Sequence, residues 1–236
     1  LILPQATALH LDASTLVFDL TALDGEAWHK RAWADVRPDD WDLACVYAVS
    51  DDVRTQLDST FWNQVQVVPG GVPYVIDGSG SFPRVSVTGE QVVNYPPLKL
   101  DEAGELVEGS KDHFVCYQSF VIQLFSNFGY WDLSVSRADT TDQGIEHLYV
   151  QGNVCSTFGA GTGLYALEDN TTVHLIPKTL NAGTTGDRVN AACGNTNTSW
   201  LDVLGVMAVK INSDNHGTST ANLTYTLMSS DQNFPN

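Results

Sequence analysis

Hydrophobic and polar residues alternate one by one along much of this chain, most clearly between Phe114 and Ser136. Apolar residues of one parity run along a first arm (Phe114, Cys116, Phe120, Ile122 and Leu124) and a second arm (Trp131, Leu133 and Val135). A period of two is that of a β-strand with one buried face. Ser126-Asn127-Phe128-Gly129 lies between the arms and is rich in residues that tolerate turns. We therefore expect a long β-hairpin here, around which the rest of the chain is organised.

The N-terminal segment 1–23 shows the same period in two shorter pieces. Leu9 and Leu11 share one parity, and after Asp12-Ala13-Ser14 the apolar residues change to the other parity at Leu16, Phe18 and Leu20. This pattern predicts two short strands. An extended apolar terminus can be donated to a neighbouring subunit as an added strand, so these five side chains are our candidates for partner contact. The alternative is that they form ordinary first strands of the chain's own sandwich.

Turn signals divide the remainder of the chain. Thr88-Gly89-Glu90 predicts a hairpin between strands at 84–87 and 91–95, and Asp101–Gly104 predicts a tight turn with a left-handed Gly104. The stretch 177–199 is rich in Gly, Thr and Asn and is interpreted as a long loop. Further strands are expected at 43–49, 61–68, 72–76, 146–150, 163–167, 172–176, 203–211 and 221–228, and a short helix only at 26–34.

These signals predict an all-β fold with about twelve short strands and at most one short helix. Frequent short strands separated by turns are typical of an antiparallel β-sandwich, either immunoglobulin-like or jelly-roll. We interpret residues 1–236 as a single domain, with an extended N-terminal segment 1–23 and an elaborated region 24–110.

The net charge of the chain restricts the kinds of partner that it can bind. The chain has 28 acidic and 11 basic residues, for a net charge of −17. Phosphate recognition needs Lys and Arg, so nucleic acid and anionic membrane surfaces are not expected partners. No apolar stretch is long enough for direct membrane insertion. The chain begins at Leu1 rather than Met, which we interpret as removal of a secretory signal, giving an extracellular or cell-surface location.

Four cysteines are present, Cys45, Cys116, Cys155 and Cys193, and none forms a C-x-x-C pair. An even number with wide spacing suits two disulfides in an oxidising compartment. Three pairings are possible, and we favour Cys116 with Cys155 and Cys45 with Cys193. The alternative is four buried thiols in a reducing cell.

No catalytic or cofactor motif is recognisable, because the six histidines are scattered and no serine lies in a hydrolase elbow. We therefore predict a non-enzymatic protein without a cofactor. Calcium is the alternative, at Asp39-Asp40-Trp41-Asp42 and Asp51-Asp52, although these lack the spacing of an EF-hand. Trp28, Trp33 and Trp41 can form a platform for glycan contact, but such residues more often cover the end of a β-core.

The second half of the chain carries a resemblance. Its segments SNFGYWDLSVS at 126–136, VMAVKINSD at 206–214 and TANLTYTLMSS at 220–230 resemble secreted bacterial cell-envelope β-sandwich proteins of the fibre, pilus or surface-layer type. The resemblance implies an extracellular structural role without an active site. The strand pattern also resembles that of a single-jelly-roll viral capsid protein.

The leading hypothesis is a structural subunit of an extracellular or surface fibre, pilus or lattice. It would assemble with copies of itself, and the N-terminal strand is the element that we expect to be donated. The alternatives are a single-jelly-roll viral capsid protein and a carbohydrate-binding surface module. A hydrolase with carboxylates gathered from distant strands is a further, weaker hypothesis.

Overall fold

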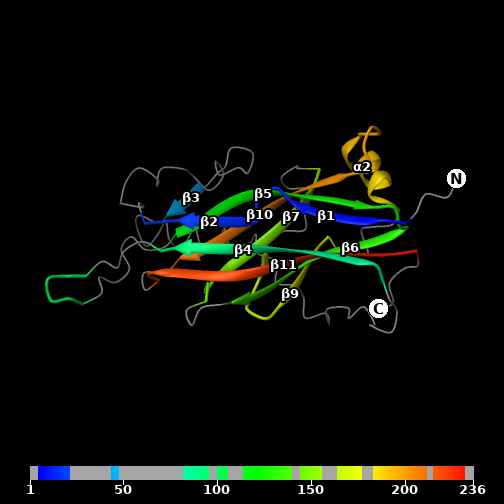
Figure 1. Ribbon diagram of the computed structural model, residues 1–236. Helices are drawn as coiled ribbons and strands as arrows, with labels where there is room; N and C mark the ends of the chain where they lie inside the picture. The colour runs from blue at the N-terminus through cyan, green and yellow to red at the C-terminus, as the bar shows by residue number, and fades with distance from the viewer. Residues whose placement is uncertain are drawn as a thin grey trace.

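The computed structural model describes residues 5–21, 44–47, 82–95, 100–105, 114–139, 144–155, 164–176, 183–211 and 215–231. These residues form two packed β-sheets and one α-helix (Figure 1). Eleven strands lie within these ranges, whereas the sequence predicts about twelve over the whole chain. The predicted fold class, an all-β sandwich, is confirmed.

Each sheet consists of strands that are far apart in the sequence. Sheet A has the order β1 (Thr7–Leu11), β5 (Phe114–Ser126), β10 (Leu201–Ile211), β7 (Leu148–Val154) and β8 (Tyr165–Ala166), and β3 (Ala44–Tyr47) also pairs with β5. Sheet B has the order β2 (Thr15–Asp19), β4 (Arg84–Asn94), β11 (Thr218–Ser230), β6 (Tyr130–Asp139) and β9 (Thr172–Ile176). All of these pairs are antiparallel except β2 with β4, which is parallel.

The eight strands β4 to β11 are wound as a jelly roll. They form the rows β4-β11-β6-β9 and β5-β10-β7-β8. Consecutive strands therefore lie in opposite sheets at every step except from β7 to β8. This winding distinguishes a jelly roll from an immunoglobulin-like sandwich, in which hairpins join neighbours in one sheet.

The prediction of a central hairpin is wrong, although both of its strands exist. β5 lies in sheet A and β6 in sheet B, and the two do not pair with each other. Residues 127–129 cross from one sheet to the other, and Phe128, in the middle of this crossing, is buried. An alternating pattern reports which face of a strand is buried, but it does not report the neighbouring strand.

The hairpin expected at Thr88-Gly89-Glu90 is also wrong, because β4 runs without interruption from Arg84 to Asn94. Gly89 does not form a turn; it allows the Ser14 backbone and the Tyr225 ring to lie close to β4. A Cβ atom at this position would lie 3.3 Å from the Ser14 carbonyl oxygen and 3.3 Å from the Tyr225 ring. The turn at Asp101–Gly104 is confirmed, with Gly104 at φ 81°.

A helix replaces part of the loop that was expected at 177–199. α2 (Thr185–Cys193) begins at a capping box, in which Thr184 Oγ accepts from Asp187 N–H and the Asp187 carboxylate accepts from Thr184 N–H. It ends at Gly194, which adopts φ 64°. Thr followed three residues later by Asp, with a glycine after the last turn, is a helix signal. The loop was predicted from the Gly, Thr and Asn content of the segment, which does not reveal this signal.

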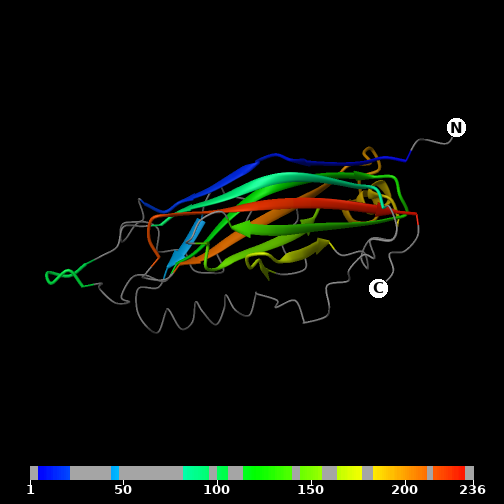
Figure 2. The same ribbon diagram turned by 60° about the horizontal axis from the view of Figure 1, so that its bottom comes forward.

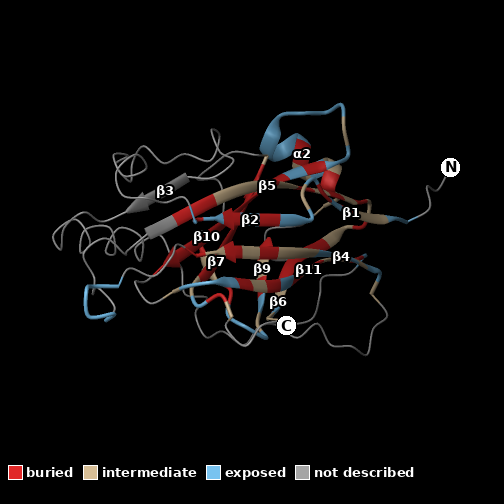
Figure 3. Cartoon of the chain, turned by 60° about the vertical axis from the view of Figure 1, so that its left-hand side comes forward, coloured by how far each residue is buried: buried red, intermediate tan, exposed pale blue. Residues whose placement is uncertain are grey.

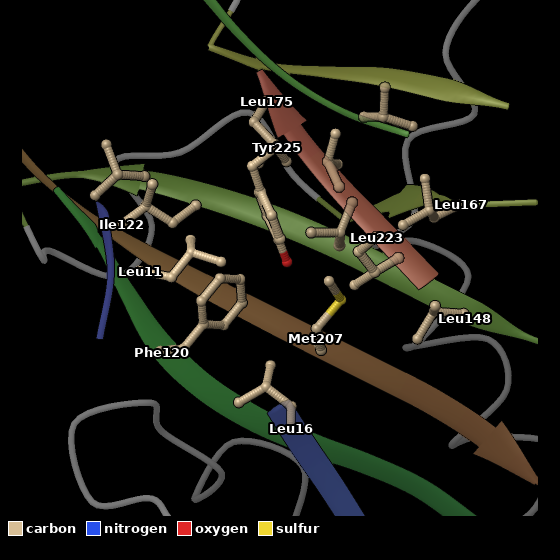
Figure 4. Close-up of a cluster of buried hydrophobic side chains, with 14 of the residues drawn as sticks. Leu11, Leu16, Phe120, Ile122, Leu148, Leu167, Leu175, Met207, Leu223 and Tyr225 are labelled. Atoms are coloured by element: carbon tan, nitrogen blue, oxygen red, sulfur yellow. The ribbon is translucent and has the colours of Figure 1, made fainter. Parts of the chain in front are cut away.

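The core lies between the two sheets and uses the inward parity of each strand (Figure 3). Trp131, Tyr225 and Phe18 are among its largest fully buried side chains. The Phe120 and Tyr225 rings pack edge to face, with centroids 5.8 Å apart (Figure 4). Because the two rings come from opposite sheets, they join the two layers at the centre of the sandwich.

The disulfide pairing that the sequence favoured is wrong. Cys155, directly after β7, is bonded to Cys193, at the end of α2, with Cα atoms 5.5 Å apart. Cys116 is also in a disulfide, and the register of β3 and β5 places Cys45 opposite it. The pairing follows the strand order, which brings the ends of β7 and α2 together and which cysteine spacing cannot reveal.

Candidate functional site

The N-terminal strap, residues 5–20, is the feature of the fold that the jelly roll itself does not require. It runs as one extended segment along the edge of the sandwich (Figure 2). Its first half, β1, pairs with β5 at the edge of sheet A, and its second half, β2, pairs with β4 at the edge of sheet B. The strap therefore joins the two sheets along the side where both would otherwise end.

Hydrogen bonds hold the strap along its length. At its start Ala6 N–H donates to Asn127 Oδ1 at 2.7 Å, and at its end Leu20 N–H donates to the Asn94 carbonyl at 2.9 Å. Between these points the strap pairs in register with five residues of β5 and five residues of β4. An edge strand exposes a row of unpaired N–H and C=O groups, and the strap covers part of that row on both sheets.

The strap changes sheets at Asp12-Ala13-Ser14. Asp12 N–H donates to the Val121 carbonyl at 3.1 Å, and Asp12 Oδ1 accepts from Val121 N–H at 2.8 Å. Two residues later the Ser14 carbonyl accepts a hydrogen bond from Glu90 N–H at 2.8 Å, and this carbonyl lies close to Gly89. The crossing explains the change of parity in the sequence, because each half of the strap must direct its apolar side chains into the core from a different sheet.

All five predicted partner-contact side chains lie in the core of their own chain. Leu9 and Leu11 are each 8% exposed, Leu16 is 6% exposed, and Phe18 and Leu20 are 0% exposed. Figure 4 shows Leu11 beside Phe120 and Ile122 in this cluster. The structure thus brings the five together at one edge, and partner contact through a donated strap stays a prediction.

Gln91, on β4, is a residue that holds the strap and that sequence reasoning missed. It lies on the inward parity of β4, is 0% exposed, and donates from Nε2 to the Leu16 carbonyl at 3.0 Å. Burying an amide among apolar side chains is costly unless it is hydrogen-bonded. A glutamine among the valines of β4 (Val85, Val87 and Val93) was the available signal, and it marks where the strap docks.

A series of hydrogen bonds through Thr and Ser residues, most of them buried, connects the strap to the rest of the sandwich. Thr7 Oγ1 bonds to Ser229 Oγ at 2.9 Å, and Ser229 Oγ bonds to Ser126 Oγ at 2.9 Å. Thr185 Oγ1 then accepts from Ser126 N–H at 2.9 Å and donates to the Ser199 carbonyl at 2.6 Å. This network ties β1, β11, β5 and α2 together at one end of the molecule.

A buried carboxylate paired with a histidine lies elsewhere, on the outer face of sheet B. Asp132 is 1% exposed, and its Oδ1 is 2.8 Å from His174 Nδ1 on the neighbouring strand β9. The pair links β6 to β9 next to an irregularity in their register. Among the described residues no group of three His, Cys, Asp or Glu side chains is arranged to hold a metal ion. We assign no chemistry to the pair.

The other positions singled out from the sequence lie outside the described residues. These are the calcium candidates at 39–42 and 51–52, the tryptophans Trp28, Trp33 and Trp41, and the short helix at 26–34.

Comparisons with protein-family models, curated proteins and solved structures find no match. In the described part of the chain, no helix has the length and apolar character needed to cross a membrane. The Cys155–Cys193 disulfide indicates folding in an oxidising environment, which is typical of proteins outside the cytoplasm.

Proposed function

We propose that this protein is a structural subunit that assembles with copies of itself into an extracellular or surface lattice or shell. The observation that carries the proposal is the N-terminal strap. It makes backbone pairs and apolar contacts with the edges of two different sheets. It therefore holds the two sheets together, rather than adding one more strand to a single sheet.

The strap is suited to exchange between copies. Its contacts with β4 and β5 are chemically the same whether the strap comes from the same chain or from a neighbour, so exchange costs little once copies are close together. Residues 21–43 connect the strap to β3. Twenty-three residues of fully extended chain reach up to roughly 75 Å, which is long enough to reach a neighbouring jelly roll.

The jelly-roll winding favours a lattice or shell over a pilus. Viral capsid and lectin domains are jelly rolls, and this part of the argument rests on fold analogy alone. An oxidising environment fits a location on a cell or particle surface. The protein would then act without catalysis, through burial of surface between copies.

The assembly state tests the function directly. The protein would be purified with its disulfides intact, separated by size-exclusion chromatography over a series of concentrations, and imaged by negative stain. We expect ordered sheets or closed particles. A monomer of 25.6 kDa at every concentration and salt condition would refute the proposal.

A designed disulfide tests the exchange of the strap separately. Val17 on β2 and Val92 on β4 face each other in register on the outer side of sheet B. In the double variant Val17→Cys/Val92→Cys, exchange predicts covalent multimers on a non-reducing denaturing gel of the assembled protein. Cross-linked monomers would show that each strap stays with its own chain. The two single variants control for random cross-linking.

A further inference from the structure

A pair of aromatic side chains, one exposed and one half-buried, lies on the outer face of sheet A, at the end near α2. Trp200 immediately precedes β10 and is 42% exposed. Its ring packs against that of Phe125 on β5, with centroids 5.6 Å apart and the ring planes tilted by 42°. A single exposed apolar residue needs no explanation, but two adjacent aromatic rings form a platform.

A polar row lies directly beside this platform. In the register of the sheet Asp202 is opposite Gln123, and Gln123 is opposite His10. Gln123 Nε2 donates to Asp202 Oδ1 at 3.1 Å. This bond uses one amide hydrogen and one carboxylate oxygen, so each side chain keeps further hydrogen-bonding capacity toward solvent. We call these five residues, Trp200, Phe125, Asp202, Gln123 and His10, the Trp200 patch.

The segment that carries Trp200 is fixed from several directions. Trp200 N–H donates to Thr198 Oγ1 at 3.1 Å, and the Ser199 carbonyl accepts from Thr185 Oγ1 at 2.6 Å. The preceding helix is attached to β7 by the Cys155–Cys193 disulfide. A ligand that stacks on Trp200 would therefore have little chain to order, and preorganisation of this kind favours affinity.

The arrangement fits a sugar ring better than a protein surface. A pyranose has one face of C–H groups, which packs on aromatic rings, and an edge of hydroxyl groups, which pairs with carboxylate, amide and imidazole groups. The cores of protein interfaces are depleted in charged residues, whereas Asp202 is exposed immediately beside the rings. The net charge of −17 disfavours an anionic glycan.

We infer that the Trp200 patch is a binding site for neutral glycans, with Trp200 and Phe125 as the stacking platform and Asp202, Gln123 and His10 as the hydrogen-bonding row. This site uses none of the tryptophans at 28–41, and His10 is its one residue on the strap. It lies on an outer face of the roll, where an assembled lattice or shell can present it many times.

The test uses the intact, disulfide-bonded protein. It would be applied to an array of neutral oligosaccharides and then run in native gels that contain soluble mannan, galactomannan, xyloglucan or dextran, with alginate as an anionic comparison. We expect retardation in at least one neutral gel and none in alginate. In Trp200→Ala we expect the affinity to fall at least tenfold.

Val17→Ala is the matched control, because Val17 is 41% exposed on the opposite sheet, and its binding should equal that of the original protein. Asp202→Asn should weaken binding without changing the assembly state. The inference is overturned by absence of binding to every neutral glycan, or by binding that Trp200→Ala leaves unchanged. Loss of assembly in Trp200→Ala without loss of glycan binding would also overturn it, since the patch would then be a subunit interface.

Discussion

Replacement of Phe18 by alanine tests whether the strap belongs to the core. The Phe18 side chain is 0% exposed and reaches the core from β2, the second half of the strap. Truncation of a fully buried phenylalanine costs about 3 to 5 kcal/mol, from lost burial and from the cavity that remains. The total stability of a domain is typically about 5 to 15 kcal/mol. We therefore expect the strap to contribute a substantial part of the free energy of unfolding.

Urea denaturation would measure the effect at one fixed protein concentration, because exchange of the strap would make stability depend on concentration. With a dependence on urea of about 2 kcal/mol per molar, a loss of about 4 kcal/mol moves the midpoint down by about 2 M. Val17→Ala is the matched control, since the neighbouring side chain is 41% exposed and should cost below about 1 kcal/mol. Equal midpoints for the two variants would refute the placement of the strap.

Three further effects follow from particular contacts and can be measured by the same denaturation assay. In Gly205→Ala the new methyl group would lie 2.4 Å from a ring atom of Phe120, so we expect a loss of about 1 to 3 kcal/mol from overpacking. Thr184→Ala removes the cap of α2 and should cost about 1 kcal/mol at pH 7. That cost should shrink as the pH falls toward the pKa of Asp187, which hydrogen bonds from the Thr184 N–H and hydroxyl hold below its usual value. Burial raises the pKa of Tyr95 to about 12, so its neutral form favours the folded state, and stability should fall between pH 10 and pH 12 by up to about 2 to 3 kcal/mol.

Each of these effects has its own control. Gly129→Ala should be tolerated, because the nearest atom to a Cβ at that position is 3.9 Å away. Tyr95→Phe should show a smaller loss of stability above pH 10 than the original protein, and an unchanged slope would contradict the assignment to Tyr95. If Thr184→Ser lost as much stability as Thr184→Ala, the capping hydroxyl would not be the cause.

The sequence was sufficient to predict features that depend on a single strand, such as its position and its buried face. Alternation identified β1 and β2 and the side chains that each of them buries, and strands were also predicted at the positions of β9 and β11. This works because successive side chains of a strand point to opposite faces, so the period of two is a local property of the backbone. The number of such strands identified the all-β class, and a local turn signal identified the left-handed Gly104.

Sequence reasoning failed for residues whose role depends on contact with a segment far away in the sequence. Gly89 was interpreted as a turn because glycine is common in turns, whereas it is required by the backbone of Ser14 crossing above it. Likewise, the sequence suggested a platform at Trp28, Trp33 and Trp41. Trp200 became a candidate only when the structure placed it against Phe125, with Asp202 close by.

The sequence by itself determined that this chain folds into half-buried strands, and that the N-terminal segment 1–23 has two apolar pieces of opposite parity. Only the tertiary structure decided that β5 and β6 lie in different sheets, that Cys155 bonds to Cys193, and that the strap clips the edges of two sheets together. The physical reason is that alternation sets the face of a strand, whereas pairing depends on which edges meet when the roll closes around a shared core.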